Sequence, residues 1–200
     1  MSPILSARGG LSAGAYGWGA ASGGAVASFD SIQTTTLGSS SATVTLSSIP
    51  STYKHLQVRI ATRSTDTSYT DNLQFYFNSD TTSANYSSGN KGFSWTNTSY
   101  GDSGGGWGSY IGTTASSTPA ASASSYHFAS YIIDIFDYQS TSKNKIVKYK
   151  GGWAYSPYLQ GGYTEGIWLN SSTAINSITF DLGNGNFAAN STFSVYGIGD

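Results

Sequence analysis

Residues 126–137 read Tyr-His-Phe-Ala-Ser-Tyr-Ile-Ile-Asp-Ile-Phe-Asp and form the longest run of strong β-formers in the chain. Successive side chains of a strand point to opposite faces. Each face of this run carries three large apolar side chains: Tyr131, Ile133 and Ile135 on one, and Phe128, Ile132 and Phe136 on the other. A strand that is apolar on both faces is typical of the middle of a covered sheet. The pattern therefore predicts a central strand with something packed above and below it.

A second run, Lys-Ile-Val-Lys-Tyr-Lys at residues 145–150, follows after a polar segment. The spacing indicates a β-hairpin whose loop is longer than two residues. One antiparallel register suits both runs, and its predicted pairs are Asp137 with Lys145, Asp134 with Lys148, Ile133 with Tyr149, and Ile135 with Val147. Such pairs contribute roughly 0.2–1 kcal/mol each, and a slip of one residue would turn every side chain to the wrong face. The odd-numbered face is the predicted core face, and the face with Asp134 and Lys148 is predicted to be only partly dry.

Shorter alternating runs recur along most of the chain. In residues 54–62 the apolar side chains Leu56, Val58 and Ile60 share one face. Further strands are predicted at 29–37, 42–46, 73–77, 163–170, 175–182 and 193–198, with short strands and long surface loops in residues 79–125. Asn184-Gly185 is typical of a type I′ turn. With about ten short strands and no helix of more than a turn or two, the sequence predicts an all-β fold, an antiparallel β-sandwich or jelly roll.

The composition limits the class of protein. A length of 200 residues suits one β domain, or one domain with a tail. Charged residues make up 10% of the chain and the net charge is −1, so no attraction to nucleic acid or to an anionic membrane is expected. The chain has no cysteine, which excludes disulfides, thiolate zinc sites and cysteine nucleophiles. No apolar run approaches the ~20 residues of a membrane span, and no secretory signal is expected.

Residues 1–28 differ from the rest because they consist mostly of Gly, Ala and Ser. They have no periodicity and cannot bury enough surface by themselves to offset the entropy of ordering. A flexible linker is one interpretation, and an arm held by another protein surface is the other. We predict an extended N-terminal arm that attaches to partner subunits through Leu11, Tyr16 and Trp18, followed by a β-sandwich domain at residues 29–200.

Several segments, taken together and in order, carry a resemblance to a known family. They are residues 29–36 (FDSIQTTT), 48–59 (SIPSTYKHLQVR), 75–80 (FYFNSD), 133–138 (IDIFDY), 166–170 (GIWLN), 174–178 (AINSI) and 193–198 (FSVYGI). The chain resembles a group of small β-rich structural proteins of tailed bacteriophages that are abundant in phages of aquatic bacteria. The resemblance implies a virion component without an enzymatic role. Residues 90–125 and the Gly/Ala-rich arm depart from the family pattern.

The titratable side chains do not form a convincing catalytic set. Glycoside hydrolysis needs two carboxylates that face each other across a cleft. The candidates are Asp66, Asp71, Asp80, Asp102, Asp134, Asp137, Glu165 and Asp181, and either lysine partners or turn positions explain most of them. His55 and His127 lie in predicted strands without the spacing of a serine elbow or a metal site. We therefore expect no enzyme activity and no cofactor.

Two binding alternatives have weak support. Calcium could be bound by Asp66, Asp71, Asn72 and Asp80, but their spacing matches no known loop. The lysines at 143, 145, 148 and 150 form the one basic cluster, and solvated or paired lysines explain it better than nucleic-acid binding does.

Aromatic residues in segments rich in Gly, Ser and Asn are stronger candidates for binding. One group is Trp95, Tyr100, Trp107 and Tyr110, and another is Trp153, Tyr155, Tyr158 and Tyr163. Exposed aromatic rings suit subunit interfaces and also carbohydrate stacking, and ordinary core or rim packing is a third possibility.

These observations predict a non-enzymatic virion structural protein at the particle surface. Capsid decoration is favoured over a tail or fibre component, because a compact domain without a fibrous repeat covers a shell more readily. The expected partners are other virion proteins, contacted through the arm, and further copies of the chain in a homo-oligomer such as a trimer. The alternative is a carbohydrate-binding adhesin for host surface glycans. Neither nucleic acid nor a membrane is an expected partner.

Overall fold

The computed structural model describes residues 29–94, 99–112, 117–155 and 158–199. Within these ranges the chain forms strands and no helix. The first seven strands are β1 (Asp30–Thr36), β2 (Thr43–Leu46), β3 (His55–Thr62), β4 (Thr70–Asp71), β5 (Leu73–Phe77), β6 (Tyr86–Ser94) and β7 (Ser99–Gly108). The others are β8 (Ile111–Gly112), β9 (Thr118–Pro119), β10 (Ala129–Phe136), β11 (Lys145–Tyr155), β12 (Tyr158–Trp168), β13 (Ile178–Leu182) and β14 (Thr192–Ile198).

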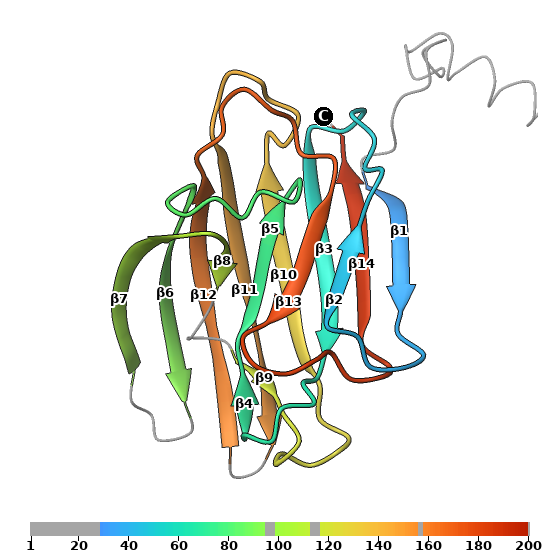
Figure 1. Cartoon of the computed structure of the whole chain (residues 1–200), viewed down its shortest axis with the longest axis vertical. Coiled ribbons are helices and arrows are strands. Elements are labelled where there is room, and N and C mark those ends of the chain that lie inside the picture. The colour runs from blue at the N-terminus through green and yellow to red at the C-terminus, as the bar shows by residue number, and fades with distance from the viewer. Residues whose placement is uncertain (1–28, 95–98, 113–116, 156–157, 200) are drawn as a thin grey trace, which may run out of the picture.

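The strands form two facing antiparallel sheets, which confirms the predicted β-sandwich (Figure 1). The large sheet has eight strands in the order β1-β14-β3-β10-β11-β12-β6-β7. The small sheet has four, in the order β2-β13-β5-β8, and β4 pairs with β9 as a separate ribbon. The jelly-roll form and the N-terminal arm stay predictions, and Leu11, Tyr16 and Trp18 lie outside the described residues.

The predicted central strand is in the middle of the large sheet. β10 lies between β3 and β11, and the predicted register is confirmed by the pairs Ile133–Tyr149, Asp134–Lys148 and Ile135–Val147. The core face is also confirmed, because Tyr131, Ile133 and Ile135 are all buried. Local alternation of side chains was sufficient for these predictions because one face must be apolar over its whole length.

The predicted ion pairs of this hairpin are wrong in detail. Asp137 adopts a left-handed backbone conformation (φ 48°), so the strand ends before it and its carboxylate lies 3.2 Å from Lys143 Nζ. Lys145 points inward, is fully buried and donates from Nζ to the Asn170 carbonyl at 2.7 Å. Lys148 lies 3.0 Å from Glu165 on the other neighbouring strand. The strand register fixes which Cα atoms are opposed. A long side chain on a central strand can nevertheless reach an ion-pair partner on either of the two neighbouring strands.

The expectation that something packs on both faces of β10 is wrong, whereas the prediction that the face with Asp134 and Lys148 is only partly dry is confirmed. Its odd-numbered face packs on the small sheet, but Phe136 is 36% exposed and Ile132 and Asp134 are only partly buried. The apolar residues of the even-numbered face therefore belong to an open surface of the large sheet.

Aromatic side chains dominate the core between the two sheets. Phe75 of β5 contacts Phe180 of β13 and, across the layers, Tyr149 of β11, with ring centroids 5.7 and 5.8 Å apart. Phe77 packs against Trp168 of β12 in the same way, at 5.5 Å. Such pairs contribute about 0.5–1.5 kcal/mol each beyond the burial of their apolar area. The core thus fixes how the small sheet lies on the large one.

Two further predictions differ from the structure. Residues 79–125 contain two long strands, β6 and β7, where short strands were expected. These strands are rich in Gly and Ser and pair through backbone hydrogen bonds, so they lack the alternation of apolar and polar side chains by which a strand is predicted. Asn184-Gly185 does not close a hairpin, because it connects β13 in the small sheet with β14 in the large sheet and neither residue has positive φ. Its amides instead bind the buried carboxylate of Asp71.

A buried arginine holds the loop between β9 and β10. The guanidinium of Arg63 donates hydrogen bonds to the carbonyls of Ala120, Ala123, Ser124 and His127, at 2.6, 2.6, 2.6 and 3.1 Å. Burial lowers the pKa of Arg63, but an arginine stays charged under ordinary conditions. One side chain therefore binds four carbonyls of this loop, in addition to backbone hydrogen bonds such as those from the Ala123 amide to Ala120 and from the His127 amide to Ser124.

Asp80 connects the loop after β5 with β12. Its carboxylate accepts hydrogen bonds from Trp168 Nε1 at 2.8 Å, Asn85 Nδ2 at 2.9 Å and the Thr82 amide at 3.0 Å. Partial desolvation tends to raise the pKa of Asp80, but these hydrogen bonds together outweigh it and lower the pKa to about 2.

We expect Asp80 to make the fold sensitive to acid. The folded-state pKa lies below the unfolded value, so its stabilisation is complete above about pH 4 and is lost as the pH falls toward 2. Solvent screening of this partly exposed group reduces the effect, and we expect it to contribute about 1 kcal/mol to the free energy of unfolding. Asp80→Asn should be less stable than the unmodified protein at pH 7, and the difference should shrink by pH 2 in urea titrations.

Asp181→Asn is the matched control, with the opposite expected sign. Desolvation raises the pKa of Asp181, and its Oδ1 is buried without a hydrogen-bond partner among the described residues. A carboxyl with a raised pKa loses its stabilising contribution as the pH rises, so neutralising it should stabilise the protein at pH 7. A difference between Asp80→Asn and the unmodified protein that stays constant from pH 7 to pH 2 would contradict the assignment to Asp80.

Candidate functional site: the outer face of the large sheet

The outer face of the large sheet, which is the face turned away from the small sheet, carries exposed apolar side chains. Phe136 of β10 is opposite Ile146 of β11, which is in turn opposite Ile167 of β12. Phe136 and Ile146 are 36% and 50% exposed, and Ile167 is partly buried. We call these three residues the apolar row. Exposed apolar side chains in contact with one another indicate a binding surface more strongly than single ones do.

Two shallow hollows lie on the same face. The first, of about 230 Å³, is lined by Ile132, Asp134, Lys148, Tyr149, Lys150, Tyr163, Thr164 and Glu165. The second, of about 360 Å³, lies over β6, β11 and β12 and includes Ile146 and Ile167 of the apolar row. Glu165 lines both hollows, so they adjoin each other. Gly89 lines the second hollow, and nothing lies within 4 Å of the position a Cβ would take there, so the missing side chain helps to keep the hollow open.

The polar side chains of the first hollow are held in place by neighbours. Lys148 and Glu165 form an ion pair at 3.0 Å, and Asp134 Oδ1 accepts a hydrogen bond from Gln57 Nε2 at 2.8 Å. Tyr163 is 53% exposed, so its ring is available to a ligand. The hollow thus combines one aromatic ring, an aliphatic wall at Ile132, two carboxylates and two ammonium groups.

The structure places the aromatic candidates from the sequence differently. Trp153 is buried and packs against Tyr69, with ring centroids 5.6 Å apart, so its role is core packing and not ligand binding. Tyr110 is 41% exposed after β7, and Tyr163 lines the first hollow. The backbones of Tyr100, Trp107, Tyr155 and Tyr158 lie in strands but their side chains are outside the described part, as is all of Trp95.

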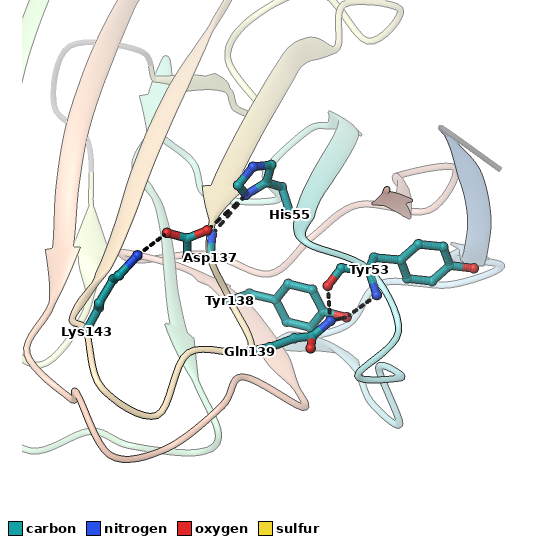
Figure 2. A network of polar contacts seen from close by, with 6 residues as sticks. All are labelled: Tyr53, His55, Asp137, Tyr138, Gln139 and Lys143. Carbon is teal, nitrogen blue, oxygen red and sulfur yellow. Dashed lines mark hydrogen bonds and ion pairs between the residues drawn. The ribbon is translucent and has the colours of Figure 1, made fainter. Parts of the chain in front are cut away.

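A second group of polar side chains forms a network at the end of β10 (Figure 2). The Asp137 amide donates to His55 Nδ1 at 3.0 Å, and the Asp137 carboxylate lies between His55 and Lys143. The pKa of Asp137 is lowered, and the hydrogen bond from Lys143 makes the largest contribution to this shift. The imidazole ring of His55 packs on Phe136 at 5.5 Å.

The other half of this network ties the segment before β3 to the end of β10. Tyr138 is buried and donates its hydroxyl hydrogen to the Pro50 carbonyl, while Gln139 Nε2 donates to the Tyr53 carbonyl. Figure 2 shows Tyr138 and Gln139 side by side against the backbone of Tyr53. The geometry is that of a clamp between two loops, so we assign this network a structural role.

The carboxylates considered for catalysis or calcium are spread over the fold. Asp71 is buried and accepts hydrogen bonds from Ser64 Oγ and the amides of Asn184 and Gly185. Asp80 binds Trp168 in a different part of the sandwich. Among the described residues there is no cluster of three or more side chains able to hold a metal ion, and no helix long and apolar enough to span a membrane.

Sequence reasoning predicted that the face with Asp134 and Lys148 is only partly dry, but it still expected packing on both faces of β10 and did not identify this surface as a binding site. A signal for exposure was present in β11, where Ile146 alternates with the buried Val147 and shares its face with Lys148 and Lys150. A face that carries lysine at two of three positions is more often open to solvent than covered.

Comparison with known proteins does not identify a family. Neither the family models nor the curated proteins compared with this chain give a match. One similar solved structure is the Clostridium perfringens CspB protease, at 14% sequence identity and a TM-score of 0.18. The alignment covers 78% of this chain and 24% of the protease chain. A likeness of this size carries no argument about fold or function.

Proposed function

We propose that the chain is a non-enzymatic structural protein at the surface of a bacteriophage particle, and that it docks on neighbouring subunits through the apolar row. The supporting observation is that Phe136, Ile146 and Ile167 are cross-strand neighbours on an open sheet face. Interface cores are depleted in charge and rich in such residues. The resemblance to virion proteins favours this partner class, and capsid decoration is preferred to a tail or fibre position.

The N-terminal segment is proposed to act in the same attachment. Phe29, where the described structure begins, stacks on Tyr196 with ring centroids 4.8 Å apart, and Arg59 lies over both rings. Arg59 and Tyr196 belong to β3 and β14, so the chain is anchored beside the large sheet at the point where residues 1–28 join it. Leu11, Tyr16 and Trp18 are the proposed contacts to partner virion proteins.

Particle incorporation tests this proposal. Ile146→Lys should reduce the amount of protein on purified particles at least tenfold, because a charge in the row would have to be desolvated on docking. Leu159→Lys is the matched control, since Leu159 is 46% exposed on β12 but outside the row. Deleting residues 1–28 should also abolish incorporation while leaving the melting temperature nearly unchanged.

Imaging of labelled protein should place it on the capsid shell. Absence from purified particles, or normal occupancy for both Ile146→Lys and the truncated protein, would refute the proposal. A second candidate function is a carbohydrate-binding adhesin for host glycans, which is favoured by the exposed ring of Tyr163 beside an open hollow.

A further inference from the structure

The strand register aligns cationic side chains across the outer face. Arg59 of β3 is opposite Ile132 of β10, which is opposite Lys150 of β11. Lys150 is opposite Tyr163 of β12, which is opposite Lys91 of β6. We call this line, Arg59-Ile132-Lys150-Tyr163-Lys91, the basic row. It runs perpendicular to the strands and is separate from the apolar row, which crosses β11 four residues away at Ile146.

The spacing of the basic row follows from sheet geometry. Neighbouring strands lie about 4.8 Å apart, so cations on every second strand repeat at about 10 Å. Arg59, Lys150 and Lys91 occupy these alternate strands and are all exposed. Between them lie one aliphatic and one aromatic side chain. Charge, flat apolar surface and charge therefore alternate along one line.

The first hollow adjoins this row and supplies hydrogen-bonding groups. Asp134 and Glu165 lie two residues along their strands from the basic row, and therefore on the same face, with Lys148 between them. Glu165 and Lys148 neutralise each other at 3.0 Å. Carboxylates and amides are good partners for hydroxyl groups, and the exposed ring of Tyr163 offers a flat surface for a sugar ring.

We propose that the basic row and the first hollow bind an anionic polysaccharide that lies across the strands. One sugar ring stacks on Tyr163. The acidic groups on the two sides of this ring bind Lys150 and Lys91, and the next acidic group along the polysaccharide binds Arg59. A chain with one carboxylate per disaccharide matches this arrangement, because two linked pyranose rings span a length similar to the repeat of the row. The hydroxyls of the sugar next to Lys150 face Asp134.

The charges of the face favour a polyanion over a neutral glycan. Arg59, Lys91, Lys148 and Lys150 give four positive charges against two negative ones from Asp134 and Glu165, which leaves two positive charges in a chain whose overall net charge is −1. Arg59 is kept in place by the rings of Phe29 and Tyr196, at 5.1 and 5.2 Å. The site does not depend on where the protein sits on a particle, so it can be tested separately from the proposed virion role.

The test is binding of a hyaluronan hexasaccharide, which carries one carboxylate per disaccharide, to the full chain by NMR titration. Lys150→Gln should weaken binding about tenfold, since one charge-assisted hydrogen bond is lost. Tyr163→Ser should weaken it by a similar factor. Binding should also weaken as salt is raised from 50 to 300 mM, because exposed charges are screened.

Matched controls separate this site from general effects. Lys143→Gln changes an exposed lysine outside the row, and Tyr126→Ser removes a ring that is 90% exposed in the loop before β10, so both should bind like the unmodified protein. All four altered side chains are exposed, and unchanged melting temperatures would confirm that each variant folds. The proposal is overturned if the hexasaccharide does not bind, or if Lys150→Gln and Lys143→Gln bind it equally. It is also overturned if a neutral dextran oligomer or a poly-dT oligonucleotide binds as tightly.

Discussion

Arg63→Met is expected to lower the free energy of unfolding by about 4 kcal/mol. The substitution keeps the aliphatic volume but removes four hydrogen bonds to the carbonyls of the loop between β9 and β10. A buried acceptor that loses its partner costs about 1–3 kcal/mol, and partial rehydration of the loop recovers some of the combined loss. Urea unfolding at pH 7 measures the difference.

Arg59→Met is the control for this prediction. Arg59 lies on β3, which ends one residue before Arg63, but it is exposed, and its guanidinium lies over the rings of Phe29 and Tyr196. A surface contact of this kind is worth about 0.5–1 kcal/mol. Arg63→Lys should fall between the two, because a lysine ammonium has only three donors and cannot replace all four hydrogen bonds of the guanidinium. If Arg63→Met and Arg59→Met cost the same, the loop does not depend on this guanidinium.

Gly152→Ala is expected to destabilise the protein by about 3 kcal/mol or more. Gly152 has φ +154°, and a Cβ atom there would overlap the Gln160 carbonyl and the Cα of Gly161 on β12. Its cross-strand partner on β12 is itself a glycine, Gly161, and on the other side it pairs with Ser130 of β10. The two strands approach too closely for a side chain, so β11 and β12 would have to separate at the centre of the large sheet.

Gly89→Ala provides the comparison within the same sheet. Gly89 pairs with Glu165 of β12 and nothing lies within 4 Å of the position a Cβ would take. Alanine there restricts the unfolded chain without strain, so stability should stay the same or rise by about 0.4–1 kcal/mol. Thermal and urea unfolding should therefore show changes in the free energy of unfolding that differ between the two variants in sign as well as in size. Equal, small effects would show that the sheet adjusts easily at Gly152.

Two interpretations of the outer face can be separated by experiment. Docking between subunits depends on the apolar row at Ile146, whereas polysaccharide binding depends on Lys150 and Tyr163. Loss of incorporation in Ile146→Lys with normal hexasaccharide binding would indicate two functions at two ends of one sheet face. The reverse pattern would favour the adhesin over the structural protein.

The sequence by itself determined the all-β class, the central position of β10, its register with β11 and its core face. These features follow from local alternation, because each strand must present one continuous apolar face to the core. Residues 54–62 are a second example, since Leu56, Val58 and Ile60 share one face as predicted, and the structure shows that this face is buried. Glycine-rich strands such as β6 carry no such alternation, and their length was not predicted for that reason.

Only the tertiary structure decided that the second apolar face of β10 stays open and which partners the charged residues bind. Ile132 and Phe136 are as apolar as Ile133 and Ile135, yet the small sheet covers only the side of β10 that carries Ile133 and Ile135. Lys145 bonds to the Asn170 carbonyl and lies over Trp168, and Arg63 bonds to a loop more than fifty residues away. The basic row joins Arg59, Lys91, Lys150 and Tyr163 through the strand order, which places residues side by side regardless of their distance along the chain. Strand order depends on how all the apolar faces pack together, and no local pattern contains that information.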